Sequence, residues 1–181
     1  MLTDIFNQIH KDFKGAVKYS KHAFRYATLA TVADGLPFQR TIVLRDVTDT
    51  NDLLIYTDER SKKVAQLKRN KNASLLFYDH NRLTQVILRG TISIETKGEG
   101  VEERWQKVRE RSQKDYITSL GPGIPVDNPD QVTYLKEQNY FTILNFVPDE
   151  IEYLRLKRPN HIRALFTKSE SEEWDMTFLV P

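Results

Sequence analysis

Short segments rich in β-branched and aromatic residues follow one another along most of this chain, and turn signals separate them. Such residues favour strands, so the succession predicts a mainly β fold. Ala33-Asp34-Gly35 carries the Asp-Gly signal of a tight hairpin between the first two segments. The expected strands cover residues 26–32, 37–46, 53–57, 73–78, 83–95, 140–146, 150–155, 162–167 and 174–180.

The sequence contains fewer helical patterns than strand patterns. Apolar residues recur at helical spacing in three stretches, which predicts helices over residues 2–19, 62–69 and 98–112. The density of glycine and proline in residues 120–129 predicts a long loop. Gly90, inside an expected strand, predicts a bulge, a bend or a close backbone approach. Together these patterns predict an antiparallel β-barrel with peripheral helices, an α+β fold that is mainly β.

Length and composition narrow the class further. The 181 residues suffice for one domain with a real core, and no internal boundary divides them. A net charge of +2 with interspersed signs argues against a general nucleic-acid binder. The lack of cysteine excludes disulfides and thiolate metal sites. Because no signal-peptide pattern and no apolar run of membrane-spanning length is evident, we expect a cytoplasmic protein without a membrane partner.

Basic residues cluster where the second expected helix begins. Ser61, Lys62 and Lys63 stand in its first turn, and Arg40 lies on a neighbouring expected strand. The helix macrodipole favours acidic residues at this end, so cations there are unusual. Cations together with free N–H groups suit a phosphate, which makes this set a candidate phosphate site. The alternative is a solvated basic helix face.

Two further sets of polar residues are candidate site residues. Gln85 opens an apolar strand, and its amide can hydrogen-bond an imide edge of a planar ring or a phosphate oxygen. The alternative is an exposed residue at a strand end. His161 and Arg163 alternate at the start of another strand, so they are expected to point to one face. His161 can donate to an anion or transfer a proton, and the alternative is a polar loop.

Other classes of site lack their signatures. The four histidines show no pair at a metal-ligand spacing, so no metal site is expected. A Gly-rich phosphate loop, a dinucleotide fingerprint and a Gly-x-Ser-x-Gly elbow are all missing. The residues alone therefore predict a β-barrel with a candidate site for a phosphate-bearing ligand.

Several short motifs occur in an order that resembles one known family. They are Ala30-Thr31-Val32, Gly35-x-Pro37, Arg40 to Arg45, Tyr56-Thr57, Ser61-Lys62-Lys63, Asn72 to Phe77, Gln85-Val86, Ile151 to Leu154, His161-x-Arg163 and Trp174 to Pro181. This set resembles the pyridoxamine 5′-phosphate oxidase-like, FMN-binding split-barrel family, with Lys62 where the family has arginine. The resemblance implies one split-barrel domain over residues 1–181. Its core would cover about 24–97 and 140–181, with a helix-and-loop insertion at about 98–139.

The resemblance also implies a function. A family member is a homodimer with FMN at its interface, and it transfers a hydride from an amine or alcohol to FMN, with oxygen as the acceptor. The implied cofactor-binding residues are Arg40, Thr41, Ile42, Val43, Leu44, Tyr56, Thr57, Ser61, Lys62, Lys63, Gln85 and Arg163. Alternating Ile42 and Leu44, together with Tyr56, suit an apolar ring plane. Arg45 and His161 would face a small-molecule substrate and are the candidate catalytic residues.

The chain departs from the family pattern in its substrate region. Leu154 stands where the family has tryptophan, and Phe178 stands where it has arginine. Arg109 and Arg111 lie near the family's Tyr…Arg-x-Arg…Ser pattern, but in a different context. The departures at Leu154 and Phe178 favour one alternative to an oxidase, which is a flavin- or tetrapyrrole-binding carrier or sensor without turnover. A further alternative, which does not depend on them, is a β-barrel interaction module without a cofactor.

Overall fold

The computed structural model describes all 181 residues, and its strands form one eight-stranded antiparallel sheet. The strands are β1 (Tyr26–Ala33), β2 (Leu36–Val47), β3 (Leu53–Asp58), β4 (Asn72–Asp79), β5 (Thr84–Glu95), β6 (Phe141–Arg155), β7 (Ile162–Lys168) and β8 (Trp174–Leu179). The helices are α1 (Leu2–Lys18), α2 (Lys62–Arg69), α3 (Glu99–Lys107) and α4 (Glu110–Gln113). Short 3₁₀ turns cover Ala23–Arg25, Lys114–Tyr116 and Pro129–Gln131. No helix is both long enough and apolar enough to cross a membrane.

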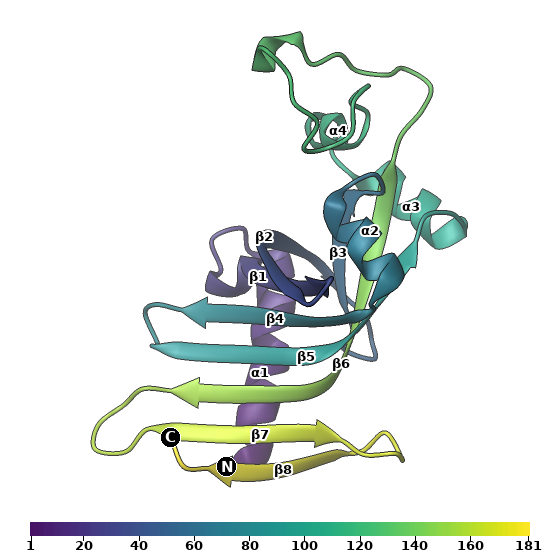
Figure 1. Cartoon of the computed structure of the whole chain (residues 1–181). Coiled ribbons are helices and arrows are strands. Elements are labelled where there is room, and N and C mark those ends of the chain that lie inside the picture. Colours follow the sequence, from purple (N-terminus) through teal and green to yellow (C-terminus); the bar gives the residue numbers. More distant parts are fainter.

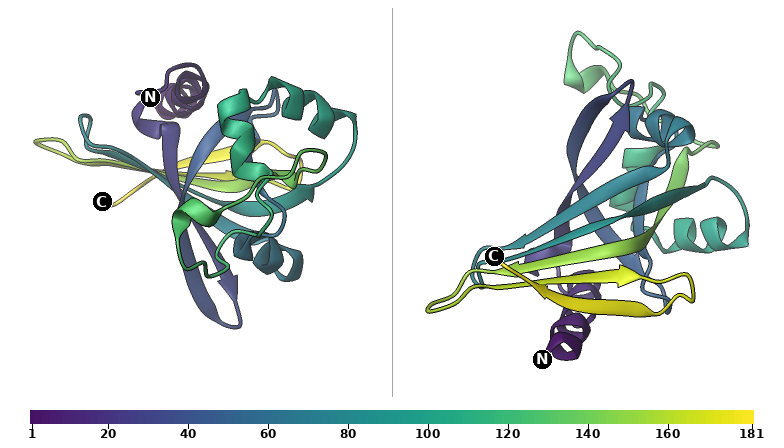
Figure 2. Two further views of the ribbon diagram at one scale, coloured as in Figure 1. Left: turned by 90° about the horizontal axis from the view of Figure 1, so that it is seen from above. Right: turned by 60° about the horizontal axis from the view of Figure 1, so that its bottom comes forward.

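Six of the strands close into a barrel. Their order is β3-β2-β1-β4-β5-β6, and β3 also pairs with β6, which completes the ring. β7 and β8 continue the sheet beyond β6 and lie outside the ring (Figures 1 and 2). The antiparallel split barrel with peripheral helices that the sequence predicts is therefore confirmed.

The hairpin between β1 and β2 forms where the Asp-Gly signal predicts it. Asp34 and Gly35 have φ values of 52° and 75°, as the two central residues of a type I′ turn require. The turn fixes a register in which Leu29 pairs with Arg40 and Thr31 with Phe38. Arg40 thereby lies opposite β1, which carries two of its hydrogen-bond partners, Leu29 and Thr31.

β6 joins the barrel to the two outer strands. Its first half pairs with β3 and its second half with β7, so a single strand runs from Phe141 to Arg155. The expected division into strands 140–146 and 150–155 is wrong. The chain continues through Pro148 because that proline pairs with Gly90 beside a register shift between β5 and β6. A Cβ on Gly90 would lie 2.0 Å from the carbonyl oxygen of Val147, which confirms the predicted close backbone approach.

The largest apolar cluster fills the barrel and continues under α1. It includes five fully buried phenylalanines, which are Phe13, Phe24, Phe77, Phe146 and Phe166. α1 lies across the sheet from the β8 side toward β2, and Phe6 packs against Phe166 and Trp174 (Figure 1). A smaller cluster of Leu54, Val101, Tyr116, Phe141 and Ile143 lies under α3.

The expected helix over residues 98–112 is two helices, so that boundary is wrong. α3 ends at Lys107, Val108 adopts an extended conformation, and α4 begins at Glu110. Val101, Trp105 and Val108 all pack on the smaller cluster, and the chain turns there. The predicted loop is confirmed, since residues 117–140 hold only one 3₁₀ turn and an isolated bridge between Thr118 and Tyr134. This segment projects away from the sheet (Figure 1).

His10 on α1 should make stability depend on pH. Its ring lies between Phe6 and Phe13, and neither ring nitrogen has a hydrogen-bond partner. Burial, and then the charge of Lys14, lower the pKa of His10 below its usual value. A lowered pKa means that the unfolded chain binds more protons, so this contribution is complete above about pH 6.5 and is lost as the pH falls through the folded pKa.

We therefore expect His10→Leu to reduce the loss of unfolding free energy between about pH 7.5 and about pH 5.5. Urea unfolding of both proteins at the two pH values measures this difference. An equal loss in the variant and the wild type would contradict the assignment to His10.

Candidate functional site

A hollow of about 300 Å³ lies between β2, the start of α2 and the loop after α4. We call it the α2 hollow. Its lining residues are Phe38, Gln39, Arg40, Ser61, Lys62, Lys63, Gln66, Pro122 and Gly123. All four residues of the candidate phosphate site therefore meet at one place, namely Arg40, Ser61, Lys62 and Lys63. The predicted convergence is confirmed.

Arg40 is held in place by uncharged groups. Its guanidinium donates to Thr31 Oγ1 at 2.7 Å, to Gln66 Oε1 at 2.8 Å and to the Leu29 carbonyl oxygen at 3.3 Å. Thr31 also donates to Gln66 Oε1 at 2.8 Å. Burial lowers the pKa of Arg40, and no carboxylate pairs with it. The guanidinium is thus fixed in position while its charge stays unneutralised.

Lys63 is the second unpaired cation of the hollow. Its Nζ donates to Thr57 Oγ1 at 2.9 Å, and it makes no ion pair. Burial lowers the pKa of Lys63, and the charge of Arg40 lowers it further. Ser61 precedes α2, but its side chain does not cap the helix, so the first N–H groups of α2 have no side-chain acceptor. Two fixed cations beside uncapped N–H groups make a site for an anion.

The residues expected to hold the ring system lie on β2 and β3. Tyr56 is half-buried and packs edge-on against Phe141, and Thr57 is buried beside Ser61. Ile42 and Leu44 point into the core, with exposed fractions of 6% and 0%. The expectation that their side chains suit a ring plane is therefore wrong, because alternate residues of β2 face the barrel interior. Only their backbone groups remain available to a ligand.

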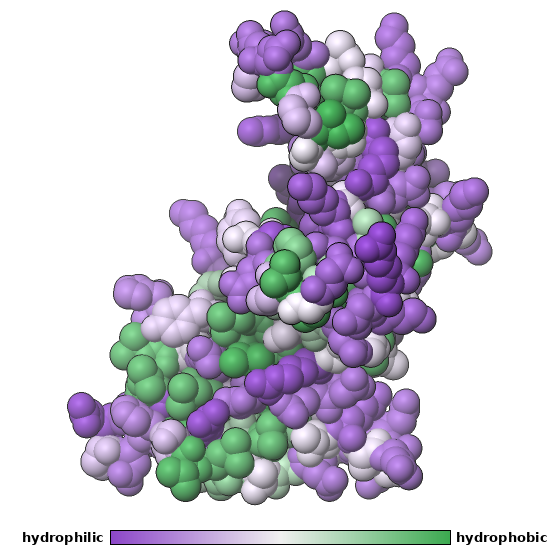
Figure 3. Space-filling view, in the orientation of Figure 1, coloured by the Kyte–Doolittle hydropathy of each residue, from purple (hydrophilic) through white to green (hydrophobic).

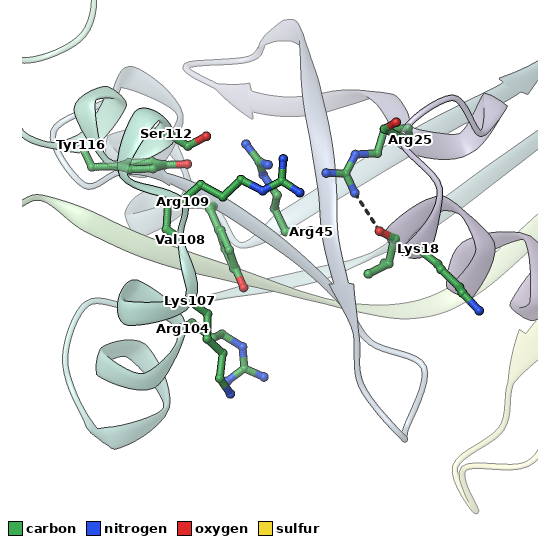
Figure 4. A pocket seen from close by; sticks show the side chains of 12 residues that line it. Lys18, Arg25, Arg45, Arg104, Lys107, Val108, Arg109, Ser112 and Tyr116 are labelled. Atoms are coloured by element: carbon green, nitrogen blue, oxygen red, sulfur yellow. Dashed lines mark hydrogen bonds between the residues drawn. The ribbon is translucent and has the colours of Figure 1, made fainter.

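A second hollow, of about 360 Å³, lies between the end of α1, β2 and α3. We call it the arginine hollow (Figure 4). Its polar lining is Lys18, Ser20, Arg25, Arg45, Tyr56, Arg104, Lys107, Arg109, Ser112 and Tyr116. Arg45 and Tyr56 lie on adjacent strands, with the guanidinium 6.0 Å from the ring centroid. Arg111, the other arginine near the family pattern, does not line this hollow.

His161 and Arg163 both line a third hollow, together with Ile162 between them, so the structure brings the two predicted residues to one place near the end of the chain. His161 Nδ1 accepts from the Lys157 backbone N–H at 3.1 Å. Arg163 donates to Glu152 Oε1 from two nitrogens, at 3.0 and 2.7 Å. Arg163 is thus oriented by a carboxylate on β6, unlike Arg40.

Gln85 lies near Arg163 and far from the α2 hollow. Gln85 pairs with Leu154, which in turn pairs with Arg163. The strand registers lead from Arg40 across β1 and β4 to Leu88 on β5. These three ladder steps span roughly 14 Å of sheet, and Gln85 lies roughly 10 Å further along β5. Within one chain, the candidate residues therefore form two separate groups, one at the α2 hollow and one around Gln85 and Arg163.

Sequence reasoning missed three residues that the geometry brings to these hollows. Gln66 follows Lys63 by three residues on α2, a spacing that places both on one helix face and could have indicated it. Thr31 is buried on β1, and only the hairpin register places it beside Arg40. Arg25 enters the arginine hollow from the turn after α1, and no local pattern marks it.

Solved structures share this fold. An FMN-binding protein related to pyridoxamine 5′-phosphate oxidase, from Nostoc punctiforme, superposes with a TM-score of 0.79 at 24% identity, covering 97% of this chain and 96% of that one. PhzG from Burkholderia lata, solved with tetrahydrophenazine-1-carboxylic acid, gives a TM-score of 0.79 at 16% identity over 96% of this chain and 91% of its own. The fold is that of the FMN-binding split barrels.

The sequence comparisons show the family. The family model described as pyridoxamine 5′-phosphate oxidase matches residues 13–154. A pyridoxine/pyridoxamine 5′-phosphate oxidase from Pseudoalteromonas atlantica is 28% identical, covering 100% of this chain and 91% of that protein. Pyridoxine/pyridoxamine 5′-phosphate oxidase 2 from Arabidopsis thaliana is 27% identical over 79% of this chain and 80% of its own. This chain belongs to the pyridoxamine 5′-phosphate oxidase family.

Proposed function

We propose that this protein is an FMN-dependent oxidoreductase that acts as a cytoplasmic homodimer on an amine or alcohol. The observation that carries the proposal is the pair of half-buried cations, Arg40 and Lys63, which face one hollow and have no carboxylate partner. Burying cations without a partner is unfavourable, and a bound phosphate removes that cost.

The α2 hollow fits the phosphate of FMN. Arg40 offers a planar fork, and Lys63 offers a compact charge beside it. Lys62 lines the same hollow and is exposed, so it adds a third cation at the rim. Ser61 and the first N–H groups of α2 complete the donor set. The backbone of residues 41–44, with Tyr56 and Thr57, lies next along β2 and β3 and would hold the ring system.

A second copy of the chain would complete the site. Gln85 and Arg163 lie too far along the sheet to reach the α2 hollow of their own chain, so in a dimer they would approach the partner's cofactor. Exposed apolar side chains on the barrel support such an interface, including Leu76 and Tyr78 on β4. Figure 3 shows apolar side chains gathered over the part of the sheet where β4 and β5 run.

Bound FMN would accept a hydride from the substrate and return the electrons to oxygen, and the protein would position both molecules. Arg45 lies on β2 beyond the residues that would hold the ring, and it would bind an anionic group of the substrate. His161 would face the substrate from the partner chain, with its Nδ1 already oriented by the Lys157 N–H. Glu152 would hold Arg163 in one orientation.

Anaerobic mixing of the FMN-loaded protein with pyridoxamine 5′-phosphate and pyridoxine 5′-phosphate tests this function. We expect the visible flavin absorbance to bleach with at least one of these two compounds and to return when air is admitted. Flavin that binds but is never reduced would contradict the oxidoreductase and would favour a flavin carrier or sensor.

Gln66 should matter for the cofactor although it carries no charge. Because Gln66 Oε1 accepts from both Arg40 and Thr31, Gln66→Leu would free the guanidinium and weaken FMN binding about tenfold, the equivalent of one hydrogen bond to a charged group. Gln66→Glu would pair with Arg40 and weaken FMN binding at least as much. Fluorescence titration measures both, and riboflavin, which lacks the phosphate, serves as the control ligand. Unchanged FMN affinity in both variants would contradict this role.

A further inference from the structure

Three arginines from three separate elements meet in the arginine hollow. Arg25 ends the turn after α1, Arg45 lies on β2, and Arg109 stands between α3 and α4. All three line the same cavity, and Figure 4 shows their guanidinium groups pointing toward one another. Arg45 and Arg109 approach from the side of α3, whereas Arg25 approaches from the side of α1.

None of these arginines forms an ion pair. Arg25 donates to the carbonyl oxygens of Ala16 and Val17 at 3.2 and 3.3 Å, which fixes it at the carbonyl end of α1. Burial, and then the charges of Arg45 and Arg109, lower the pKa of Arg25. Two other cations of the hollow do have carboxylate partners, since Arg104 lies 3.7 Å from Asp46 and Lys107 lies 3.9 Å from Glu103. The three guanidinium groups that face one another have no carboxylate partner of their own within the chain.

The charge of the hollow exceeds what one phosphate neutralises. Six cationic side chains line it, which are Lys18, Arg25, Arg45, Arg104, Lys107 and Arg109. Carboxylates pair with Arg104 and Lys107, so four of the six cations stay unpaired. A phosphate monoester carries a charge of about −1.5 to −2 at neutral pH. A cavity of about 360 Å³ also has room beyond a single phosphate group. A ligand with a second anionic group beside the first matches both the charge and the space.

We propose that Arg25, Arg45 and Arg109 form one binding site for a ligand with two neighbouring anionic groups. Arg45 and Arg109 hold the first group, and Arg25 reaches the second from the opposite wall. Arginine suits this role because its planar fork binds two oxygens of one anion at once. The identification of this ligand with the substrate rests on the proposed function, whereas the anion site itself rests on the hollow alone.

Calorimetric titration of the FMN-saturated protein with inorganic phosphate and with pyrophosphate tests the site. We expect pyrophosphate to bind about tenfold more tightly, because the second group gains a charge-assisted contact to Arg25. Arg25→Gln should abolish this preference and leave the affinity for phosphate within about twofold. Arg109→Gln should weaken both ligands. Lys21→Gln removes the same charge from an exposed neighbour outside the hollow, and it should change neither affinity.

Two further measurements separate the possible failures. Arg25→Lys keeps the charge and should retain part of the preference, and thermal unfolding shows whether each variant is folded. Equal affinity for the two probes in the wild type, or an unchanged preference in folded Arg25→Gln, would overturn the inference. If FMN does not bind, the α2 hollow stays open to the phosphate and pyrophosphate probes. Both titrations are then repeated in Arg40→Ala, which weakens anion binding in the α2 hollow. A preference that still depends on Arg25 would then support the anion site while the proposed function fails.

Discussion

Replacing Arg40 and Lys63 together by alanine is expected to weaken FMN binding by about 3 kcal/mol, or roughly a hundredfold in Kd. Each residue would lose a hydrogen bond to a charged group, and such bonds contribute about 1.5–3 kcal/mol each. We take the lower end because both side chains are only half-buried, so that solvent screens part of their charge. Quenching of FMN fluorescence on titration with protein measures the change.

Two controls separate the phosphate contact from other effects. Riboflavin lacks the phosphate, so its affinity should be the same for the wild type and for the double variant. Lys68→Ala with Lys71→Ala removes the same charge from exposed positions near α2, and it should leave FMN affinity nearly unchanged. An unchanged FMN affinity in Arg40→Ala with Lys63→Ala would contradict the assignment of the α2 hollow to the phosphate.

Gly90→Ala is expected to lower the free energy of unfolding by about 3 kcal/mol, the upper part of the range for overpacked positions. The added Cβ would lie 2.0 Å from the Val147 carbonyl oxygen and 2.9 Å from Pro148 Cα. Both atoms belong to the backbone, so a side-chain rotation cannot relieve the overlap. β5 and β6 would have to separate at their register shift, within the longest strand pair of the barrel. Urea unfolding measures the loss.

Gly100→Ala provides the matched control on α3. A Cβ there would meet only the end of the Arg104 side chain at 3.6 Å, an ordinary contact. Because alanine favours a helix over glycine by about 1 kcal/mol, this variant should be as stable as the wild type or more stable. If both glycine variants lose the same stability, the close approach at Gly90 is not the cause.

Local patterns in the sequence predict much of this fold. The Asp34-Gly35 hairpin and α2 depend on neighbours in the chain, and the structure confirms them. Gly90 inside a strand pattern predicts a close backbone approach, which is also confirmed, but not its partner, which lies on β6. The break after α3 was missed, because Val101, Trp105 and Val108 fit one helix by spacing alone. The continuity of β6 through Pro148 depends on its partner strand, which a local pattern does not contain.

The candidate sites divide in the same way. Arg40, Lys62 and Lys63 were predicted to converge because a strand and a helix start bring them together over a short distance in the chain. The role predicted for the side chains of Ile42 and Leu44 was wrong. Alternation along a strand defines two faces but does not say which face is buried. The meeting of Arg25 with Arg45 and Arg109 requires the closed barrel and α1 together.

Titration of the purified protein with FMN tests the central claim most directly. A visible spectrum is recorded first, so that any flavin that copurifies is counted. We predict saturable quenching of FMN fluorescence with one FMN per chain, as the two α2 hollows of a dimer require. If FMN fluorescence remains unquenched even at high micromolar protein, the α2 hollow does not bind this cofactor and the proposed function is wrong.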